Sequence, residues 1–464
     1  MDRHGDRTGL EAARGAASYA PAMADTDTIF ALATAPGRGG IAVLRLSGPA
    51  AAAALLAVTG IVPAARQARR VTLRDPADGT VIDHGLALLF AAPASYTGED
   101  VVELHLHGGR AIVQRTISVL ASQPGLRPAE PGEFTKRSFQ NGKLDLTQAE
   151  AVADLVAAET EGQRRQALRQ LDGALGRLYE AWRAQLTNAL AYAEADIDFA
   201  DEDLPAGLPE GTRNQVRLLR QDIGRHLGDR RAGEITRDGF HIAIVGAPNA
   251  GKSSLLNCLA RRDAAIVHET AGTTRDVVEV RLDLAGYPVI LADTAGLRQT
   301  DDAIEGEGVR RARLRAGQAD LVIGVFDAAL GEDPETRAVL DAAAARYIVR
   351  NKCDLLPVWP RARAGEVVVS ARTGQGVVRF EESLGLLVAD RLSAGLTSPA
   401  LTQARHRQAL IETVAALDRA LAGAEAELVA EDLRMAVRSL GRITGRVDVE
   451  DLLDVIFRDF CIGK

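Results

Sequence analysis

Short apolar runs alternate with turn residues in the first quarter of the chain, and this pattern predicts a small α/β or α+β domain. The runs IAVLRLSG, VIDHGLALLF and VVELHLHGG read as strands, and AIVQRTISVL after them has helical spacing. From Asp145 the apolar residues recur every three or four positions, which predicts long helices to about Asp196. Thr147 and Glu150 have the spacing of a capping box, so we expect the first of these helices to begin there.

The pattern changes again at Phe240, where apolar, β-branched runs alternate with helix-forming segments. The runs HIAIVG, YPVILAD, DLVIGVFD, RYIVRNK and EVVVSA predict a parallel sheet covered by helices on both faces, ending near Leu392. Helical periodicity returns from Leu401 to Phe457. The α/β domain is therefore predicted to be inserted into a helical one, and the fold class is multidomain α/β plus α.

Composition is that of an ordinary globular protein of about three domains. Of 464 residues, 47% are hydrophobic and 25% are charged, and no stretch reaches the ~18 consecutive apolar residues of a membrane-spanning helix. The formal net charge of -8 excludes a global positive field, so any contact with nucleic acid must be local. Cys258, Cys353 and Cys461 are far apart, which argues against a zinc site and favours a reducing, cytoplasmic location.

A phosphate-binding loop is the clearest chemical motif. The string GAPNAGKS at 246–253 matches GxxxxGK[ST] and stands between a predicted strand and the helix-forming SLLNCLA. Glycines let backbone N–H groups surround phosphates, and the helix N-terminus adds partial positive charge. We expect Lys252 to bridge the terminal phosphates as a catalytic residue and Ser253 to bind Mg²⁺.

Two further motifs follow predicted strands and indicate that the nucleotide is GTP. In DTAG, Asp293 can hold magnesium through water, and Gly296 can meet the γ-phosphate. In NKCD, Asp354 can accept hydrogen bonds from both the ring N–H and the exocyclic amine of guanine, whereas adenine offers the wrong donor pattern. Ser370 and Ala371 follow EVVV, where the last base-contacting loop is expected.

The hydrolysis machinery departs from the usual switch, because Leu297 follows DTAG where Ras-like proteins have a glutamine that orients water. Glu305 is our candidate for activating the water, with a surface-helix glutamate as an equally weighted alternative. Thr274 is expected to complete the magnesium shell. Arg275 is a possible arginine finger, although a structural salt bridge is at least as plausible.

Taken together, GAPNAGKSS, GTTRD, DTAGL and the closing CIGK strongly resemble the MnmE or TrmE family of tRNA modification GTPases. Outside the GTPase block the resemblance rests on GRGG, SYTGEDVVELHLHGG, PGEFTKRSFQNGKLDLTQAEAV and EADIDFADED. The domains it implies are a disordered extension at 1–25, a folate-binding and dimerisation domain at 26–140, helical segments at 141–235 and 396–464, and an inserted Ras-like P-loop GTPase domain at 236–395.

The resemblance implies a homodimer that works with the flavoprotein MnmG, as a heterotetramer, on tRNA. Together they would add a carboxymethylaminomethyl-type group to C5 of the wobble uridine, with a tetrahydrofolate derivative as one-carbon donor and FAD on the partner. The folate-binding residues would be Arg45, Glu103, Lys143 and Lys464. Hydrolysis would depend on K⁺ and on pairing of two GTPase domains, with Glu305 as general base. The K⁺ ligands would be Asn249, His268, Thr270 and Thr273.

The full set of GTP contacts implied by these motifs spans five loops. Its members are Asn249, Ala250, Gly251, Lys252, Ser253, Ser254, His268, Glu269, Thr270, Ala271, Gly272, Thr273, Thr274, Asp293, Thr294, Ala295, Gly296, Asn351, Lys352, Asp354, Ser370, Ala371 and Arg372.

A ribosome-assembly GTPase switch without modification chemistry is the main alternative. Such a protein should carry an RNA-binding module or basic tail, and this chain ends in an acidic helix and CIGK. A membrane-remodelling GTPase would need a basic amphipathic helix or a lipid anchor, and neither is present in the sequence. His105 and His107 could bind a metal, but structural histidines are favoured.

Overall fold

The computed structural model describes residues 27–198, 209–229, 231–262, 265–266, 279–293, 314, 316–393, 399–423, 425–447, 450–458 and 460–464. The predicted extension at 1–25 lies outside these ranges. The chain divides into two compact units, one made of residues up to Leu144 with Asp454–Lys464, the other of Asp145–Leu453. None of the helices formed by the described residues is long and apolar enough to cross a membrane.

The first unit is built on a sheet with the strand order β3-β4-β5-β2-β1-β6, which is antiparallel except for the parallel pair β1 and β6. Its strands are β1 (Thr28–Leu32), β2 (Gly39–Ser47), β3 (Arg69–Arg74), β4 (Val81–Phe90), β5 (Val101–Gly108) and β6 (Leu126–Pro128). The structure confirms the three predicted strands as β2, β4 and β5. The sequence analysis missed β1, β3 and β6, which are short.

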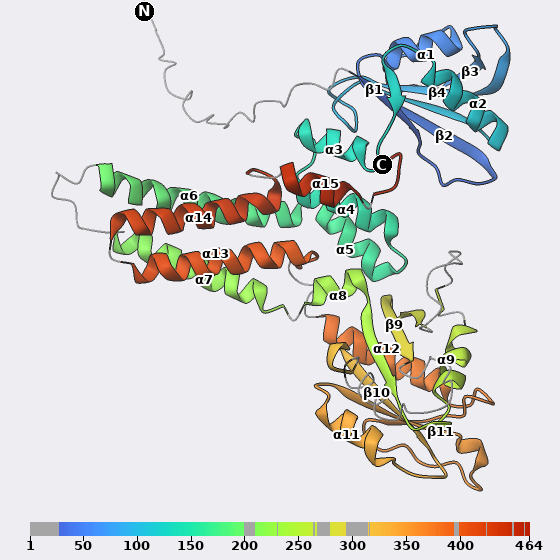
Figure 1. The fold of residues 1–464 in the computed structure, drawn as a ribbon, viewed down its shortest axis with the longest axis vertical. Helices are drawn as coiled ribbons and strands as arrows, with labels where there is room; N and C mark the ends of the chain where they lie inside the picture. The colour runs from blue at the N-terminus through green and yellow to red at the C-terminus, as the bar shows by residue number, and fades with distance from the viewer. Residues whose placement is uncertain are drawn as a thin grey trace, which may run out of the picture. The chain divides into compact units, whose positions relative to one another are not determined.

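Helices α1 (Ala51–Thr59) and α2 (Arg110–Ala121) cover one face of this sheet (Figure 1). Leu44 and Leu104 belong to the buried core that these helices share with the sheet. Since side chains alternate along a strand, Arg45 and Glu103, which oppose each other in register, lie on the other face. Helix α3 (Glu133–Gln140) follows β6.

The second unit contains a bundle in which α6, α7, α13 and α14 lie side by side (Figure 1). Their inward residues form one core, in which Leu186, Leu219, Leu417 and Leu433 are buried. The helices of this part are α4 (Leu146–Ala157), α5 (Glu161–Leu171), α6 (Ala174–Asp198), α7 (Glu210–Leu227), α8 (Ala232–Asp238), α13 (Ala404–Ala422) and α14 (Ala426–Thr444). Helix α15 (Glu450–Arg458) begins in this unit and ends among the C-terminal residues that belong to the first unit. The bundle therefore joins segments on both sides of the inserted α/β part, as predicted.

The predicted capping box was wrong by two residues. Asp145 caps α4 by accepting from the backbone N–H of Gln148, whose side chain bonds back to the Asp145 N–H. Glu150 instead pairs with α13, accepting from Arg405 Nη2 at 2.8 Å and lying 2.9 Å from His406 Nε2. Burial alone would raise the pKa of Glu150, but Arg405 and His406 lower it to about 2. The carboxylate of Glu150 therefore connects α4, from the first helical segment, with α13, from the second.

The inserted part is a sheet with the order β12-β11-β10-β7-β9-β8 among the described strands. All neighbouring pairs are parallel except β8 with β9. The strands are β7 (Phe240–Val245), β8 (Glu279–Leu284), β9 (Tyr287–Asp293), β10 (Leu321–Asp327), β11 (Arg346–Asn351) and β12 (Glu366–Val368). The sequence analysis missed the antiparallel edge strand β8, whose alternating pattern leaves one face exposed.

Helices cover both faces of this sheet, as predicted. On β10, Ile323 and Val325 enter one core, and Val322 and Phe326 enter a second core on the opposite face. The accompanying helices are α9 (Lys252–Ala260), α11 (Pro334–Ala342), the short η1 (Cys353–Leu355) and α12 (Val377–Ser393). With the phosphate loop between β7 and α9, this strand order is that of a Ras-like P-loop domain.

Candidate functional site

The phosphate loop requires glycine at positions where its backbone closely approaches the neighbouring strands β10 and β11. Gly251 has a φ of 94°, and a Cβ there would lie 2.2 Å from Asn351 Nδ2. A Cβ at Gly246 would lie 2.5 Å from the Val325 carbonyl oxygen. Lys252 begins α9 and donates to the carbonyl oxygens of Gly246, at 2.8 Å, and Ala247, at 3.0 Å. The lysine thus lies over its own loop, with Ser253 and Ser254 next on the helix.

Asn351 connects the phosphate loop to the loop that contains Ser370 and Ala371. Its Nδ2 donates to the Ala250 carbonyl oxygen at 3.0 Å, and its Oδ1 accepts from the Ala371 N–H at 3.0 Å. The next residue, Lys352, has a φ of 62° and places its ammonium 2.9 Å from Asp327 Oδ2. The structure therefore brings the GxxxxGKS, NKCD and SA motifs to one edge of the sheet.

Two neighbouring side chains orient the carboxylate of Asp354. Ser370 Oγ donates to its Oδ1 at 2.6 Å, and Arg372 pairs with its Oδ2. The Ser370 hydroxyl and then Arg372 hold the pKa of Asp354 below its ordinary value. The side chain is therefore an ionised carboxylate at neutral pH, which is the form that the predicted recognition of guanine requires.

Part of the predicted GTP site lies outside the described residues. For Asp293 only the backbone is described, at the end of β9. The predicted residues that fall outside are His268, Glu269, Thr270, Ala271, Gly272, Thr273, Thr274, Thr294, Ala295, Gly296 and Glu305. Their roles in binding K⁺, Mg²⁺ and the attacking water remain predictions.

A cavity of about 480 Å³ opens in the first unit. It is lined by Arg45, Arg66, Phe90, Ala94, Ser95, Tyr96, Val101, Glu103 and Lys143. Three of the four predicted folate-binding residues thus meet at one cavity, and Lys464 is not among its lining residues. Sequence reasoning missed Arg66, Phe90 and Tyr96. Tyr96 lies in the quoted motif SYTGED, whereas no motif marks Arg66.

One ion pair dominates the polar wall of this cavity. Arg45 donates to Glu103 Oε1 from Nη2 at 2.9 Å and from Nε at 3.1 Å, and His105 Nε2 lies 3.3 Å from Oε2. His107 pairs instead with Asp83, whose Oδ1 is 2.8 Å from the ring nitrogen. His105 and His107 thus each have a carboxylate partner. No cluster of three or more His, Cys, Asp or Glu residues suited to a metal occurs in the described part of the chain.

The loop that carries Ser95 and Tyr96 is held by α3. Ser138 Oγ donates to the Tyr96 carbonyl oxygen at 2.6 Å, and Asn141 Nδ2 donates to the Thr97 carbonyl oxygen at 2.8 Å. The Tyr96 hydroxyl lies 2.8 Å from Thr135 Oγ1. These contacts connect the position of the cavity wall to the helix that precedes Lys143.

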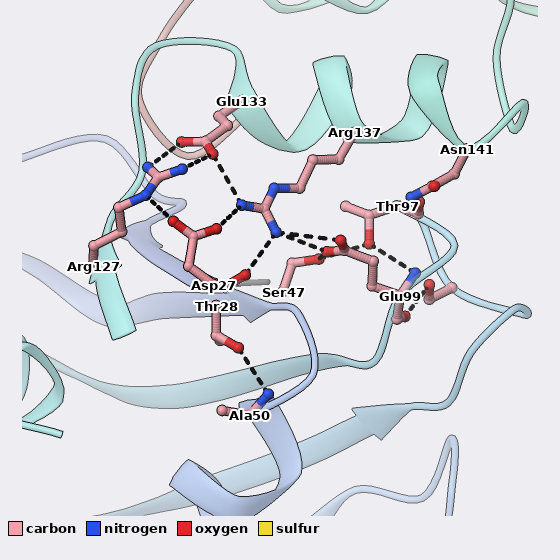
Figure 2. A network of polar contacts seen from close by, with 11 residues as sticks. Asp27, Thr28, Ser47, Ala50, Thr97, Glu99, Arg127, Glu133, Arg137 and Asn141 are labelled. Atoms are coloured by element: carbon pink, nitrogen blue, oxygen red, sulfur yellow. Dashed lines mark hydrogen bonds and ion pairs between the residues drawn. The ribbon is translucent and has the colours of Figure 1, made fainter. Parts of the chain in front are cut away.

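Arg137, on α3, is 2% exposed and lies between three carboxylates (Figure 2). Its guanidinium is 2.9 Å from Asp27 Oδ1, 3.1 Å from Glu133 Oε1 and 3.2 Å from Glu99 Oε1. Glu99 also accepts from Ser47 Oγ at 2.6 Å. The network therefore links the residue before β1 with β2, α3 and the cavity loop.

The C-terminal residues dock onto the same unit. Ile462 forms an antiparallel bridge with Pro131, and the Gly132 N–H donates to the Cys461 carbonyl oxygen at 3.4 Å. Gly463 has a φ of 95°, and a Cβ there would lie 2.4 Å from the Leu32 carbonyl oxygen. Only glycine fits this approach without strain, so the chain positions the segment that ends in Lys464.

Comparison with known proteins accounts for almost the whole chain. A family model described as the MnmE helical domain matches residues 146–461, and one described as the GTP-binding protein TrmE N-terminus matches residues 28–143. A relative from Parvibaculum lavamentivorans is 57% identical over 443 residues, covering 94% of this chain and 100% of the relative. The chain belongs to the MnmE family. The relatives that follow are named, like the first, tRNA modification GTPase MnmE.

The similarity to MnmE proteins extends to other bacteria. A relative from Paramagnetospirillum magneticum is 57% identical over 95% of this chain and 100% of its own length. One from Rhodospirillum rubrum is 54% identical over 94% of this chain and 99% of its own length. Among solved structures, the G domain of the T. maritima FeoB iron transporter is 26% identical over 32% of this chain, with a TM-score of 0.25. The Ras-like assignment rests on the strand order and motifs described above. The chain is a GTPase, a class that uses Mg²⁺.

Proposed function

We propose that this protein couples GTP hydrolysis to modification of C5 of the wobble uridine in certain tRNAs, with a tetrahydrofolate derivative as one-carbon donor. It would act in the cytoplasm as a homodimer, in a heterotetramer with the flavoprotein MnmG, which carries the FAD. The cavity with Arg45, Glu103 and Lys143 carries this proposal, because a GTPase switch alone would not need it. The names of the relatives support the tRNA substrate.

The residues at the cavity fit a reduced folate, whose ring presents an N–H and an amine side by side. A carboxylate is the natural acceptor for that pair, and Glu103 can serve because its ion pair with Arg45 orients it at the cavity. Lys143 donates to the Pro93 carbonyl oxygen at 3.0 Å and presents a cation at the same wall. When bound, the folate supplies the one-carbon unit, while these side chains bind and orient it.

At the nucleotide site, Lys252 and the backbone of the loop would hold the phosphates, and Ser253 with Thr274 would hold Mg²⁺. Asp354, supported by Ser370, would select guanine. We propose Glu305 as the base for the attacking water. We propose the same domain limits as in the sequence analysis. The folate-binding domain is 26–140 and mediates dimerisation, the GTPase domain is 236–395, and the helical domain comprises 141–235 and 396–464.

Deletion of Lys464 should weaken binding of 5-formyltetrahydrofolate by about tenfold or more, since a charge-assisted hydrogen bond is lost. Isothermal titration calorimetry measures this, and GTP affinity, measured in parallel, should not change. The same variant should fail to restore modified wobble uridines, measured by mass spectrometry, in cells that lack the protein. A folate titration unchanged by the deletion would contradict the role of Lys464, and wobble uridines that stay normal without the protein would contradict the proposed function.

Replacing Na⁺ by K⁺ at constant ionic strength should raise GTP turnover well over tenfold. The reason is that a bound K⁺ would supply the positive charge that an arginine finger gives other GTPases. Asn249, which has a φ of 63° in the phosphate loop, is the described member of the proposed ligand set. Asn249→Ala should reduce the difference between the two salts, and equal turnover of the unaltered protein in both salts would remove this mechanism.

A further inference from the structure

Arg66 lines the proposed folate cavity, yet no motif or family resemblance assigns it a role. It precedes β3 and lies at the cavity together with Phe90 and Ala94. Its side chain is exposed, so packing in the core does not explain why an arginine stands at this position. Arg66 therefore adds a positive charge to the cavity wall, and the predicted folate-binding residues Arg45, Glu103 and Lys143 do not explain it.

Both the backbone and the side chain of Arg66 are fixed by neighbours. Its φ of 63° is in the left-handed region, which is unfavourable for a side chain of this size, and its N–H donates to the Leu89 carbonyl oxygen at 2.7 Å. The guanidinium donates to the Ala94 carbonyl oxygen, and its carbon lies 5.8 Å from the centre of the Phe90 ring. An exposed arginine held in this way is pre-organised to bind a ligand, because less side-chain entropy is lost on binding.

The charges around the cavity do not cancel. Its lining holds three cationic side chains, Arg45, Arg66 and Lys143, but a single carboxylate, Glu103. Arg45 pairs with Glu103, whereas Arg66 and Lys143 donate to backbone carbonyl oxygens and have no carboxylate partner among the residues described. The cavity is therefore suited to a ligand that has donors at one end and negative charge at the other.

A folate has this distribution, with ring donors at one end and two glutamyl carboxylates at the other. We propose that Arg66 binds the glutamyl carboxylates of the folate, while Glu103 receives the ring. This inference rests on the proposed function and names the second half of the same site. The planar guanidinium can donate two parallel hydrogen bonds to one carboxylate, which a lysine cannot reproduce. Arg66 is in this view a specificity-determining residue.

The test compares two ligands that differ only at the two carboxyl groups of the tail. One is 5-formyltetrahydrofolate, and the other is its glutamyl dimethyl ester, which keeps the ring and the p-aminobenzoyl group but lacks the two negative charges. The full-length protein, Arg66→Ala and Arg66→Lys are titrated with both by calorimetry. Arg69→Ala is the matched control, because it removes an exposed arginine three positions away that does not line the cavity.

The unaltered protein should bind the free acid at least tenfold more tightly than the ester. Arg66→Ala should weaken binding of the free acid by about ten- to a hundredfold and leave binding of the ester unchanged, so that the preference disappears. Arg66→Lys should restore only part of it, and Arg69→Ala should behave as the unaltered protein. Added salt should reduce the preference of the unaltered protein and have little effect on Arg66→Ala.

Two results would overturn the inference while leaving folate binding in place. One is equal weakening of both ligands by Arg66→Ala, which would mean that Arg66 only supports the wall formed by Phe90 and Ala94. The other is an unaltered protein that binds acid and ester equally. Failure of the unaltered protein to bind either ligand would instead overturn the proposed function itself. Thermal unfolding and GTP turnover of the control Arg69→Ala should match those of the unaltered protein, since Arg69 does not line the cavity.

Discussion

Replacing Asp354 by asparagine should convert this GTPase into an enzyme that prefers xanthosine triphosphate. The carboxylate accepts at both oxygens, from Ser370 and Arg372, and offers the acceptors that the two adjacent donors of guanine require. An amide presents one acceptor and one donor, which suits xanthine, because xanthine has an oxygen where guanine has its amine. We expect kcat/KM for GTP to fall by roughly 10³-fold or more, with a gain for xanthosine triphosphate.

Arg372→Ala is the matched control for this base-specificity switch. It removes the ion pair to the same carboxylate, yet leaves the carboxylate itself in place. The Arg372 side chain is 74% exposed, so the loss of this pair should have little effect on stability or base preference. The measurement is kcat/KM for hydrolysis of guanosine triphosphate and xanthosine triphosphate by Asp354→Asn and by Arg372→Ala. An Asp354→Asn protein that still prefers GTP would refute the assignment of Asp354 to base recognition.

Replacing Arg137 by alanine should destabilise the first unit by about 3–5 kcal/mol, because it leaves three carboxylates without the buried charge between them. Glu99, Asp27 and Glu133 all approach this guanidinium (Figure 2). Arg127→Ala is the control. Arg127 pairs with Asp27 and Glu133 as well but is 37% exposed, so its loss should cost about 1 kcal/mol or less. Hydrogen exchange of peptides from β1 and α3 reports the local stability.

The same network gives the first unit a pH dependence of known sign. Burial alone would raise the pKa values of Asp27 and Glu133, but the hydrogen bonds from Arg127 and Arg137 hold both below their ordinary values of 3.8 and 4.5. The stabilisation is therefore fully present above those values and is lost as the pH falls through the lower folded pKa values. Arg137→Ala should reduce this dependence, and Arg127 should maintain part of it. Equal costs for Arg137→Ala and Arg127→Ala at neutral pH would contradict the buried role of Arg137.

Long, strongly periodic segments could be predicted from sequence, and isolated side-chain contacts could not. The parallel strands were predicted because each is a continuous apolar run, whereas β8 alternates with exposed residues and lies at an edge. The capping box was placed at Thr147 because its spacing with Glu150 fits one. The spacing does not show that Glu150 has Arg405 and His406 as partners more than 250 residues away.

The sequence by itself determined the family, the order of the α/β, helical and GTPase parts, and the guanine-nucleotide motifs. The order of the parts follows from local hydrophobic patterns, and the motifs are short strings whose glycines and polar residues nucleotide binding requires. The resemblance predicted Arg45, Glu103 and Lys143 as parts of one folate site, but only the tertiary structure decided that they line one cavity and that Arg66 joins them. Arg45 and Glu103 lie in β2 and β5, whereas Arg66 lies in the loop before β3 and Lys143 in the loop after α3. Their proximity depends on the pairing of β2 with β5 and of β4 with β5, which bring distant positions together. No local periodicity encodes that register.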